Sequence, residues 1–65
     1  MDDQRLGAAL RAARIRRSMT QQQLATRCRL SASSVSLIER GHLESLSIRA
    51  LRRVAAALDV RVEML

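Results

Sequence analysis

The sequence contains no aromatic residue, no proline and only one cysteine, Cys28, in 65 residues. A lone cysteine cannot form an intrachain disulfide and cannot supply a cysteine-based metal site. A chain of this length is also near the lower limit at which a single hydrophobic core folds on its own. We therefore expect one domain over residues 1–65, with a core built from aliphatic side chains and with Cys28 buried as a small apolar residue.

Other absences narrow the class of protein. The longest unbroken apolar run, residues 54–58, is too short to span a membrane or to form the core of a signal peptide. One histidine, one cysteine, no paired carboxylates and no glycine-rich phosphate loop leave acid-base, nucleophilic and metal chemistry without the groups they need. Without Trp or Phe as anchors, a basic helix has little to hold it on a lipid surface. We expect a protein that is not an enzyme and that binds no cofactor, metal or membrane.

The charge of the chain is strongly positive. Twelve basic residues, all of them arginine, oppose six acidic residues, which gives a formal net charge of +6. A chain of this charge favours an anionic partner, and double-stranded DNA is the first candidate. Since arginine usage also follows the base composition of a genome, only the sign of the charge bears on the partner.

Apolar periodicity predicts a first helix over residues 2–17, whose acidic start suits a helix N-terminus. Gly7 is expected to weaken this helix by about 1 kcal/mol relative to alanine. Ile15 lies off the apolar stripe, where it would meet a later helix or a second subunit. The stripe itself recurs at helical spacing: Leu6, Ala9, Leu10 and Ala13.

The best local signal is the Thr-Gln-Gln-Gln sequence at residues 20–23. The Thr20 hydroxyl can accept a hydrogen bond from the Gln23 amide, while the Gln23 side chain reaches back to the Thr20 amide. This arrangement predicts the start of a second helix. Its buried face would consist of Leu24, Ala25 and Cys28.

Two more helices follow. Ser31 caps a third helix that runs to about Arg40 and ends at Gly41. Ser47 caps a fourth helix that ends near Asp59. On this last helix the apolar face is formed by Ile48, Leu51, Val54, Ala55 and Leu58, and the solvated face by Arg49, Arg52 and Arg53.

Residues 60–65 alternate apolar and charged side chains, which is typical of a half-buried strand, although a fifth helix starting near Val62 fits as well. The predicted fold class is all-α: a compact bundle of four to five helices with a central helix-turn-helix. If the tail forms a strand, we expect this short C-terminal β-strand at a dimer interface, because an exposed strand edge is rarely left unpaired.

Residues 21–40 form two short helices separated by a tight turn, a unit that can lay one helix across DNA phosphates and the next in the major groove. The Gln-x-x-Leu-Ala sequence at residues 21–25 and the Ile-Glu-Arg-Gly sequence at 38–41, at this spacing, resemble the Xre-type family of Cro and lambdoid phage repressors. Leu30-Ser31 and residues 51–58 extend the resemblance, which covers the chain from Leu6 to Val60.

The resemblance implies how the residues are used. Gln21 takes the position whose backbone amide and side chain meet a phosphate, which agrees with the affinity of helix N-termini for anions. In the family, the third helix contacts base edges, and the stretch after it contacts the DNA backbone. The implied DNA-binding residues, with the exposed Gln22 and the turn residue Arg17 added, are Arg17, Gln21, Gln22, Ala32, Ser33, Ser36, Leu37, Arg40 and His42.

The family pattern also pairs an arginine of the first helix with the glutamate of the third, here Arg14 with Glu39, as a structural pair. Two departures stand out. Arg29 occupies the turn position that the family fills with glycine, so it would hold a positive φ at a cost of about 1 kcal/mol. Ala32 and Ser33 lack the long amides that read adenine, which predicts weak direct readout and leaves specificity to water, DNA shape or a partner.

The leading hypothesis is a sequence-specific transcriptional regulator that binds DNA as a homodimer in the cytoplasm, associated with the nucleoid. The alternative is an antitoxin similar to the HipB-like group, which would bind a protein toxin and autoregulate its operon. The apolar alternation of residues 60–65 is the feature that suggests this second reading.

Overall fold

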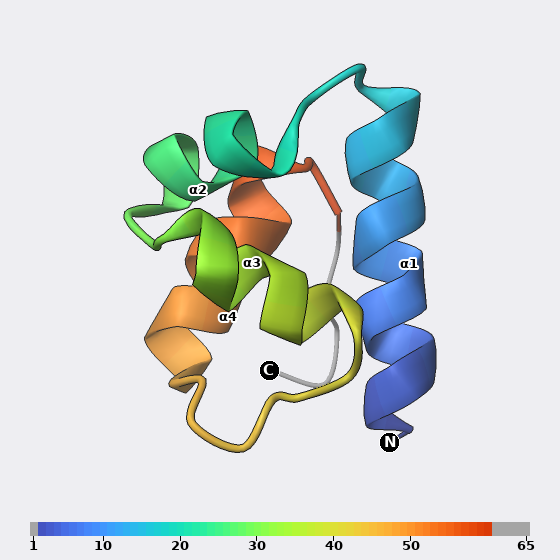
Figure 1. Cartoon of the computed structure of the whole chain (residues 1–65), viewed down its shortest axis with the longest axis vertical. Coiled ribbons are helices and arrows are strands. Elements are labelled where there is room, and N and C mark those ends of the chain that lie inside the picture. The colour runs from blue at the N-terminus through green and yellow to red at the C-terminus, as the bar shows by residue number, and fades with distance from the viewer. Residues whose placement is uncertain (1, 61–65) are drawn as a thin grey trace.

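The computed structural model describes residues 2–60, and within them the chain forms four α-helices. Their bounds are α1 Asp3–Arg16, α2 Gln21–Cys28, α3 Ala32–Glu39 and α4 Ile48–Ala57. In Figure 1, α1 stands along one side, α2 lies at the top, and α3 crosses in front of α4. The predicted all-helical fold with a central helix-turn-helix, α2 and α3, is confirmed. The predicted strand or fifth helix of the tail falls almost entirely on residues 61–65, outside the described part of the chain.

Each helix begins with a side chain that accepts a backbone hydrogen bond. The carboxylate of Asp2 accepts from the amides of Gln4 and Arg5 at 2.9 and 3.3 Å. The capping box at α2 is complete, with 3.0 Å from the Gln23 amide to the Thr20 hydroxyl and 2.8 Å from the Thr20 amide to Gln23 Oε1. Ser31 and Ser47 cap α3 and α4, each at 3.0 Å. All four predicted helix starts are therefore confirmed, which fixes where each apolar face begins.

The helices end without the help of many glycines. Gly41 terminates α3 with φ of 90°, and the amide of His42 returns to the carbonyl of Leu37 at 2.9 Å. The other three ends use left-handed residues that are not glycine: Ser18, Arg29 and Asp59. Arg29 has φ of 60°, as the departure from the family pattern predicted. Such a conformation costs an arginine about 1–2 kcal/mol relative to glycine, so packing on both sides of this turn must maintain it.

The core lies where the four helices meet. α3 packs against α1 and α2, and α2 packs against α4. Its fully buried side chains come from every helix and from the end of α4: Leu10, Leu24, Cys28, Val35, Val54 and Leu58. The core therefore contains no aromatic ring and is packed from aliphatic side chains and one cysteine. Within residues 2–60, no helix is long and apolar enough to cross a bilayer.

Two expectations for α1 need correction. Ala9, placed on the apolar stripe by its spacing, is exposed, and Gly7 is buried in its place. A Cβ atom added to Gly7 would overlap the carbonyl oxygen of Ile38 and lie 3.0 Å from the carbonyl of Glu39. Gly7 is thus the point of closest approach between α1 and the end of α3, and its missing side chain is required rather than merely tolerated.

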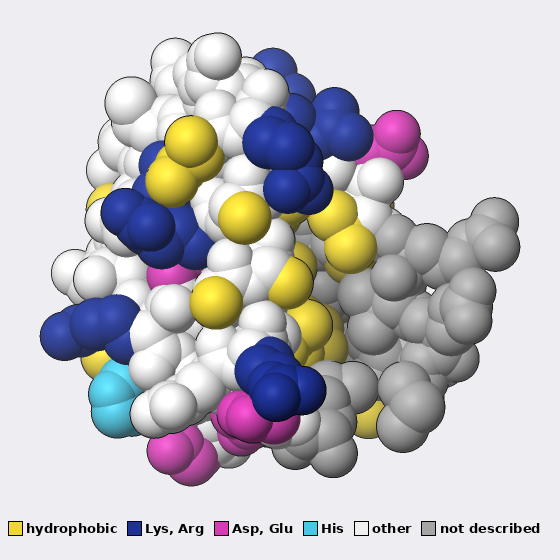
Figure 2. Space-filling model, turned by 90° about the vertical axis from the view of Figure 1, so that its right-hand side faces the viewer, with side chains coloured by type: hydrophobic (Ala, Val, Ile, Leu, Met, Phe, Trp, Pro, Cys, Tyr) yellow, Lys and Arg dark blue, Asp and Glu magenta, His cyan; other side chains and the backbone are white. Residues whose placement is uncertain are grey.

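Ile15 is half exposed, so no later helix of the described chain covers it. On the face formed by α1, the hydrophobic side chains lie in small separate groups between arginines (Figure 2). Scattered apolar side chains of this kind are ordinary on a protein surface.

Candidate nucleic-acid interface

The outward side of α3 carries four of the predicted DNA-binding residues. Val35, Ile38 and Glu39 point into the protein, so the residues between them face away from it. Ser33 and Leu37 are exposed and lie four positions apart, on the same side of the helix. The half-buried Ala32 and Ser36 flank them. We call these four residues, Ala32, Ser33, Ser36 and Leu37, the outer face of α3.

Short side chains dominate this outer face. Within residues 2–60, neither the Ser33 hydroxyl nor the Ser36 hydroxyl has a hydrogen-bond partner in the protein, whereas the Ser34 hydroxyl is engaged with Ser31 at 3.0 Å. The outer face therefore presents two available hydroxyls and the methyl groups of Ala32 and Leu37. A smooth surface of this kind can approach base edges closely in the major groove.

The N-terminus of α2 is the second part of the interface. The capping box satisfies the amide of Gln23, but the amides of Gln21 and Gln22 have no partner within the described residues. The first turn of α2 contains no acidic residue. Free amides at the positive end of a helix are the features that bind phosphate oxygens.

The side chain of Gln21 is already held by the protein. Its Nε2 atom donates to Oε1 of Glu39 at 3.1 Å, so the half-buried Gln21 links the start of α2 to the end of α3. One N–H of the amide is used in this bond and the other remains available to a ligand. The sequence predicted that Gln21 contacts a DNA phosphate, but it did not predict the contact of Gln21 with Glu39.

Glu39 is the centre of a buried polar cluster. Its carboxylate receives Nε of Arg14 at 2.7 Å and Nη2 of Arg14 at 3.1 Å, a two-point ion pair. The third nitrogen of Arg14 donates to the carbonyl of Met19 at 2.7 Å, just before α2. The side chains of Glu39 and Arg14 are only 3% and 11% exposed. The cluster therefore fixes α1, the turn into α2, and α3 relative to one another.

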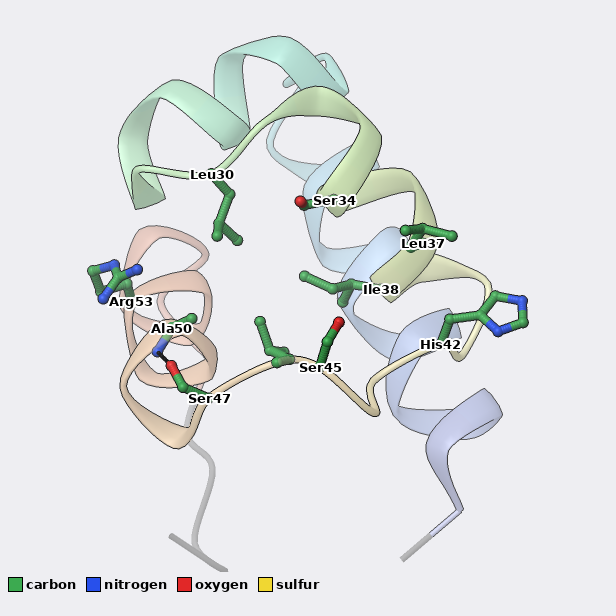
Figure 3. Close-up of a pocket in the computed structure, with 10 residues that line it drawn as sticks. Leu30, Ser34, Leu37, Ile38, His42, Ser45, Ser47, Ala50 and Arg53 are labelled. Carbon is green, nitrogen blue, oxygen red and sulfur yellow. Dashed lines mark hydrogen bonds between the residues drawn. The ribbon is translucent and has the colours of Figure 1, made fainter.

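Three residues that were predicted to contact the DNA backbone lie outside the outer face of α3 and the N-terminus of α2. Arg40 and His42 follow α3 directly and are exposed, and Nε of Arg40 donates to the carbonyl of Ser36 at 3.4 Å. His42 lies on the same side as Leu37, and both residues line the hollow between α3 and α4 (Figure 3). Arg17 differs, because it pairs with Asp59 beyond the end of α4 at 3.6 Å. The structure thus groups Arg40 and His42 with the end of α3, and Arg17 with the end of α4.

The C-terminus of α2 is held from α4. Arg53, predicted on a solvated face, is partly buried and donates from Nε to the carbonyl of Cys28 at 2.9 Å. A cation at a helix C-terminus satisfies an orphan carbonyl and complements the helix dipole. Cys28 itself is fully buried, and this burial raises the pKa of its thiol. It is a core residue, as predicted.

These features form a helix-turn-helix with a buried interior. The outer face of α3 is exposed, and α2 begins with backbone amides that have no partner within the described residues. The family model described as helix-turn-helix, of the Xre-like type, matches residues 10–65. The chain belongs to this family. Xre-like helix-turn-helix domains are DNA-binding domains of regulators, which agrees with the outer face of α3 and the positive net charge. A search of curated proteins gave no match.

Proposed function

We propose that this Xre-like domain is a sequence-specific transcriptional regulator that places α3 in the major groove of double-stranded DNA and binds as a homodimer. The observation that carries the proposal is that the protein has both an exposed outer face on α3 and backbone amides of Gln21 and Gln22 that have no partner within the described residues. One surface meets base edges and the other meets the phosphates that border the groove. In a homodimer, the two α3 helices would enter successive turns of the major groove, about 34 Å apart, so the operator would be symmetric.

In this proposal the contacts divide by role. Gln21 and Gln22 bind phosphate at one edge of the groove, and Arg40 and His42 bind it at the other. Arg17 contributes from the turn before α2. The remaining contacts, to base edges, come from the outer face of α3.

The antitoxin hypothesis depends on the alternation of apolar and charged side chains at residues 60–65. Of these only Val60 is described, where it packs against the core. No feature of the described chain favours a toxin partner, so the regulator is the function proposed.

The first experiment is selection of genomic fragments by the purified protein, followed by titration of the selected fragment over a range of salt concentrations. We expect a palindromic site and an affinity that falls steeply with salt, because each neutralised phosphate adds about 0.9 to the logarithmic slope. Gln21→Ala should weaken binding to all sequences by a similar factor, about five- to tenfold for one lost hydrogen bond. Ser33→Ala should instead reduce the preference for the selected site over other DNA.

A matched pair of arginine variants separates contact from long-range attraction. Arg40→Ala and Arg11→Ala each remove one positive charge, but Arg40 follows α3 and Arg11 is exposed on α1. Only Arg40→Ala should reduce the salt slope by about one phosphate. If no fragment is enriched, or if the two variants behave alike and affinity depends on charge alone, groove reading by α3 is wrong.

A further inference from the structure

Leu37 is an unusual side chain for its position. It is a large apolar residue, 42% exposed, on a helix side that otherwise carries Ser33 and Ser36. Leu37 and Ile38 both line a hollow between α3 and α4 (Figure 3), but Ile38 is buried and belongs to the core, whereas Leu37 does not. Leu37 therefore contributes little to the core and stands where a DNA base would lie if α3 enters the groove.

The backbone around Leu37 is fixed. The amides of Arg40 and His42 both donate to its carbonyl, at 3.1 and 2.9 Å, as α3 closes on Gly41. A side chain on a fixed backbone loses less conformational entropy when it meets a partner. Within residues 2–60, the other two large apolar residues that are exposed, Ile15 and Ile48, lie on α1 and at the start of α4, away from the outer face of α3.

The chemistry of the outer face selects its target. Serine hydroxyls donate to or accept from almost any base, so Ser33 and Ser36 can supply only part of the preference for the selected site. An aliphatic side chain can favour one base over the other three. Among the four bases, only thymine presents an apolar group in the major groove, the methyl group on C5.

We propose that Leu37 is a specificity-determining residue that reads the C5-methyl group of a thymine in the operator. This inference rests on the proposed function, since it requires α3 to enter the major groove. It differs from readout by long amides: the discrimination comes from burial of one methyl group against another apolar surface. The operator half-site should therefore contain a thymine whose methyl group, rather than its hydrogen-bonding edge, carries the preference.

The test removes that methyl group alone. In the selected fragment, each thymine is replaced in turn by uracil, which keeps the hydrogen-bonding edges of the base pair. For one thymine per half-site we expect binding to weaken about fourfold, the effect of exposing one buried carbon group. With Leu37→Ala the same replacement should have no effect, because the variant has already lost the contact.

A second arm distinguishes the methyl group from the rest of the thymine base. The sensitive T·A pair is replaced by a pair of guanine with cytosine or with 5-methylcytosine. The wild type should bind the methylated duplex more tightly than the unmethylated one by a similar factor, and Leu37→Ala should bind both equally. Ile15→Ala, which truncates an exposed apolar residue on α1, is the matched control and should keep the full uracil effect.

The outcomes separate the inference from the function beneath it. A uracil effect of equal size in the wild type and in Leu37→Ala, or no uracil effect in a protein that still selects a sequence, overturns the role of Leu37 and leaves the regulator proposal intact. Failure to select any sequence overturns both. Since Leu37 is exposed, the variant should fold, and a thermal unfolding midpoint close to that of the wild type verifies this.

Discussion

Gln21 at the start of α2 and Ser33 on the outer face of α3 belong to the same helix-turn-helix, yet the protein treats them differently. Gln21 is held by Glu39, which is itself clamped by Arg14. The Ser33 hydroxyl has no partner within residues 2–60. The side chain of Gln21 is thus tied into the fold, whereas Ser33 is held only by its backbone.

The two regions are therefore expected to respond differently to substitution. Substitution of the exposed Ser33 or Leu37 alters what the surface presents without removing a side-chain hydrogen bond within the described residues. Changes in the cluster around Glu39 alter how α1, α2 and α3 are placed. If the outer face of α3 reads the operator, as proposed, operator preference can change through substitutions there at little cost in stability.

Substitution of Glu39 is the strongest test of this comparison. Glu39→Ala leaves the Arg14 guanidinium buried without its carboxylate and releases Gln21, so we expect the free energy of unfolding to fall by about 3–5 kcal/mol. For a chain of 65 residues this is comparable to its total stability. Urea unfolding followed by circular dichroism measures the loss.

Two controls give this result its meaning. Replacing both partners, Arg14→Met with Glu39→Met, should cost less than Glu39→Ala because no charge is left buried alone. Ser33→Ala should change stability by less than about 0.5 kcal/mol. If Glu39→Ala were as mild as Ser33→Ala, the contrast between the two regions would be wrong.

Gly7→Ala tests the packing beneath the Glu39 cluster. At an ordinary position in a helix, alanine is more stable than glycine by about 1 kcal/mol. At Gly7 the new Cβ would overlap the carbonyl of Ile38 and crowd that of Glu39, so we expect a destabilisation of about 1–3 kcal/mol. The exposed Ala8 is the control, where the reverse change to glycine should cost about 1 kcal/mol. A thermal midpoint raised by Gly7→Ala would contradict the close approach of α1 to α3.

Gly7 also marks the limit of sequence reasoning for this chain. The helix starts, the capping box at Thr20 and the left-handed Arg29 were all predictable, because caps and turns depend on neighbouring residues. The cost assigned to Gly7 was a local argument of the same kind. It missed that a distant backbone segment, the end of α3, occupies the space of the side chain.

The candidate site was predictable in part. The family resemblance predicted the pair of Arg14 with Glu39, which the structure contains, and its assignment of DNA contacts to the outer face of α3 stays a prediction. The link from Gln21 to Glu39 and the bond from Arg53 to the carbonyl of Cys28 join residues 18 and 25 positions apart. Helical periodicity places a side chain on a face but does not say which helix end that face will meet, so these contacts required the structure.

The smallest expected effect concerns Cys28, in the interior that the anchored helices enclose. Burial raises the pKa of its thiol, so as pH rises the unfolded chain loses the proton first and the folded state is progressively disfavoured. Stability should be unaffected by Cys28 below about pH 8.5 and should fall above it, with a slope of at most about 1.4 kcal/mol per pH unit. The sequence has no lysine or tyrosine to titrate in this range.

Urea unfolding midpoints between pH 7.5 and pH 10 measure this dependence, and Cys28→Ala is the control, in which the alkaline fall should disappear. Alkylation by iodoacetamide provides a second reading, because a buried thiol reacts only when the chain opens. If Cys28 were alkylated as fast in the folded protein as in urea, the junction of α2 with α4 would be open to solvent. In that case α2 would not be rigidly placed, and the contrast between the region around Gln21 and the outer face of α3 would not hold.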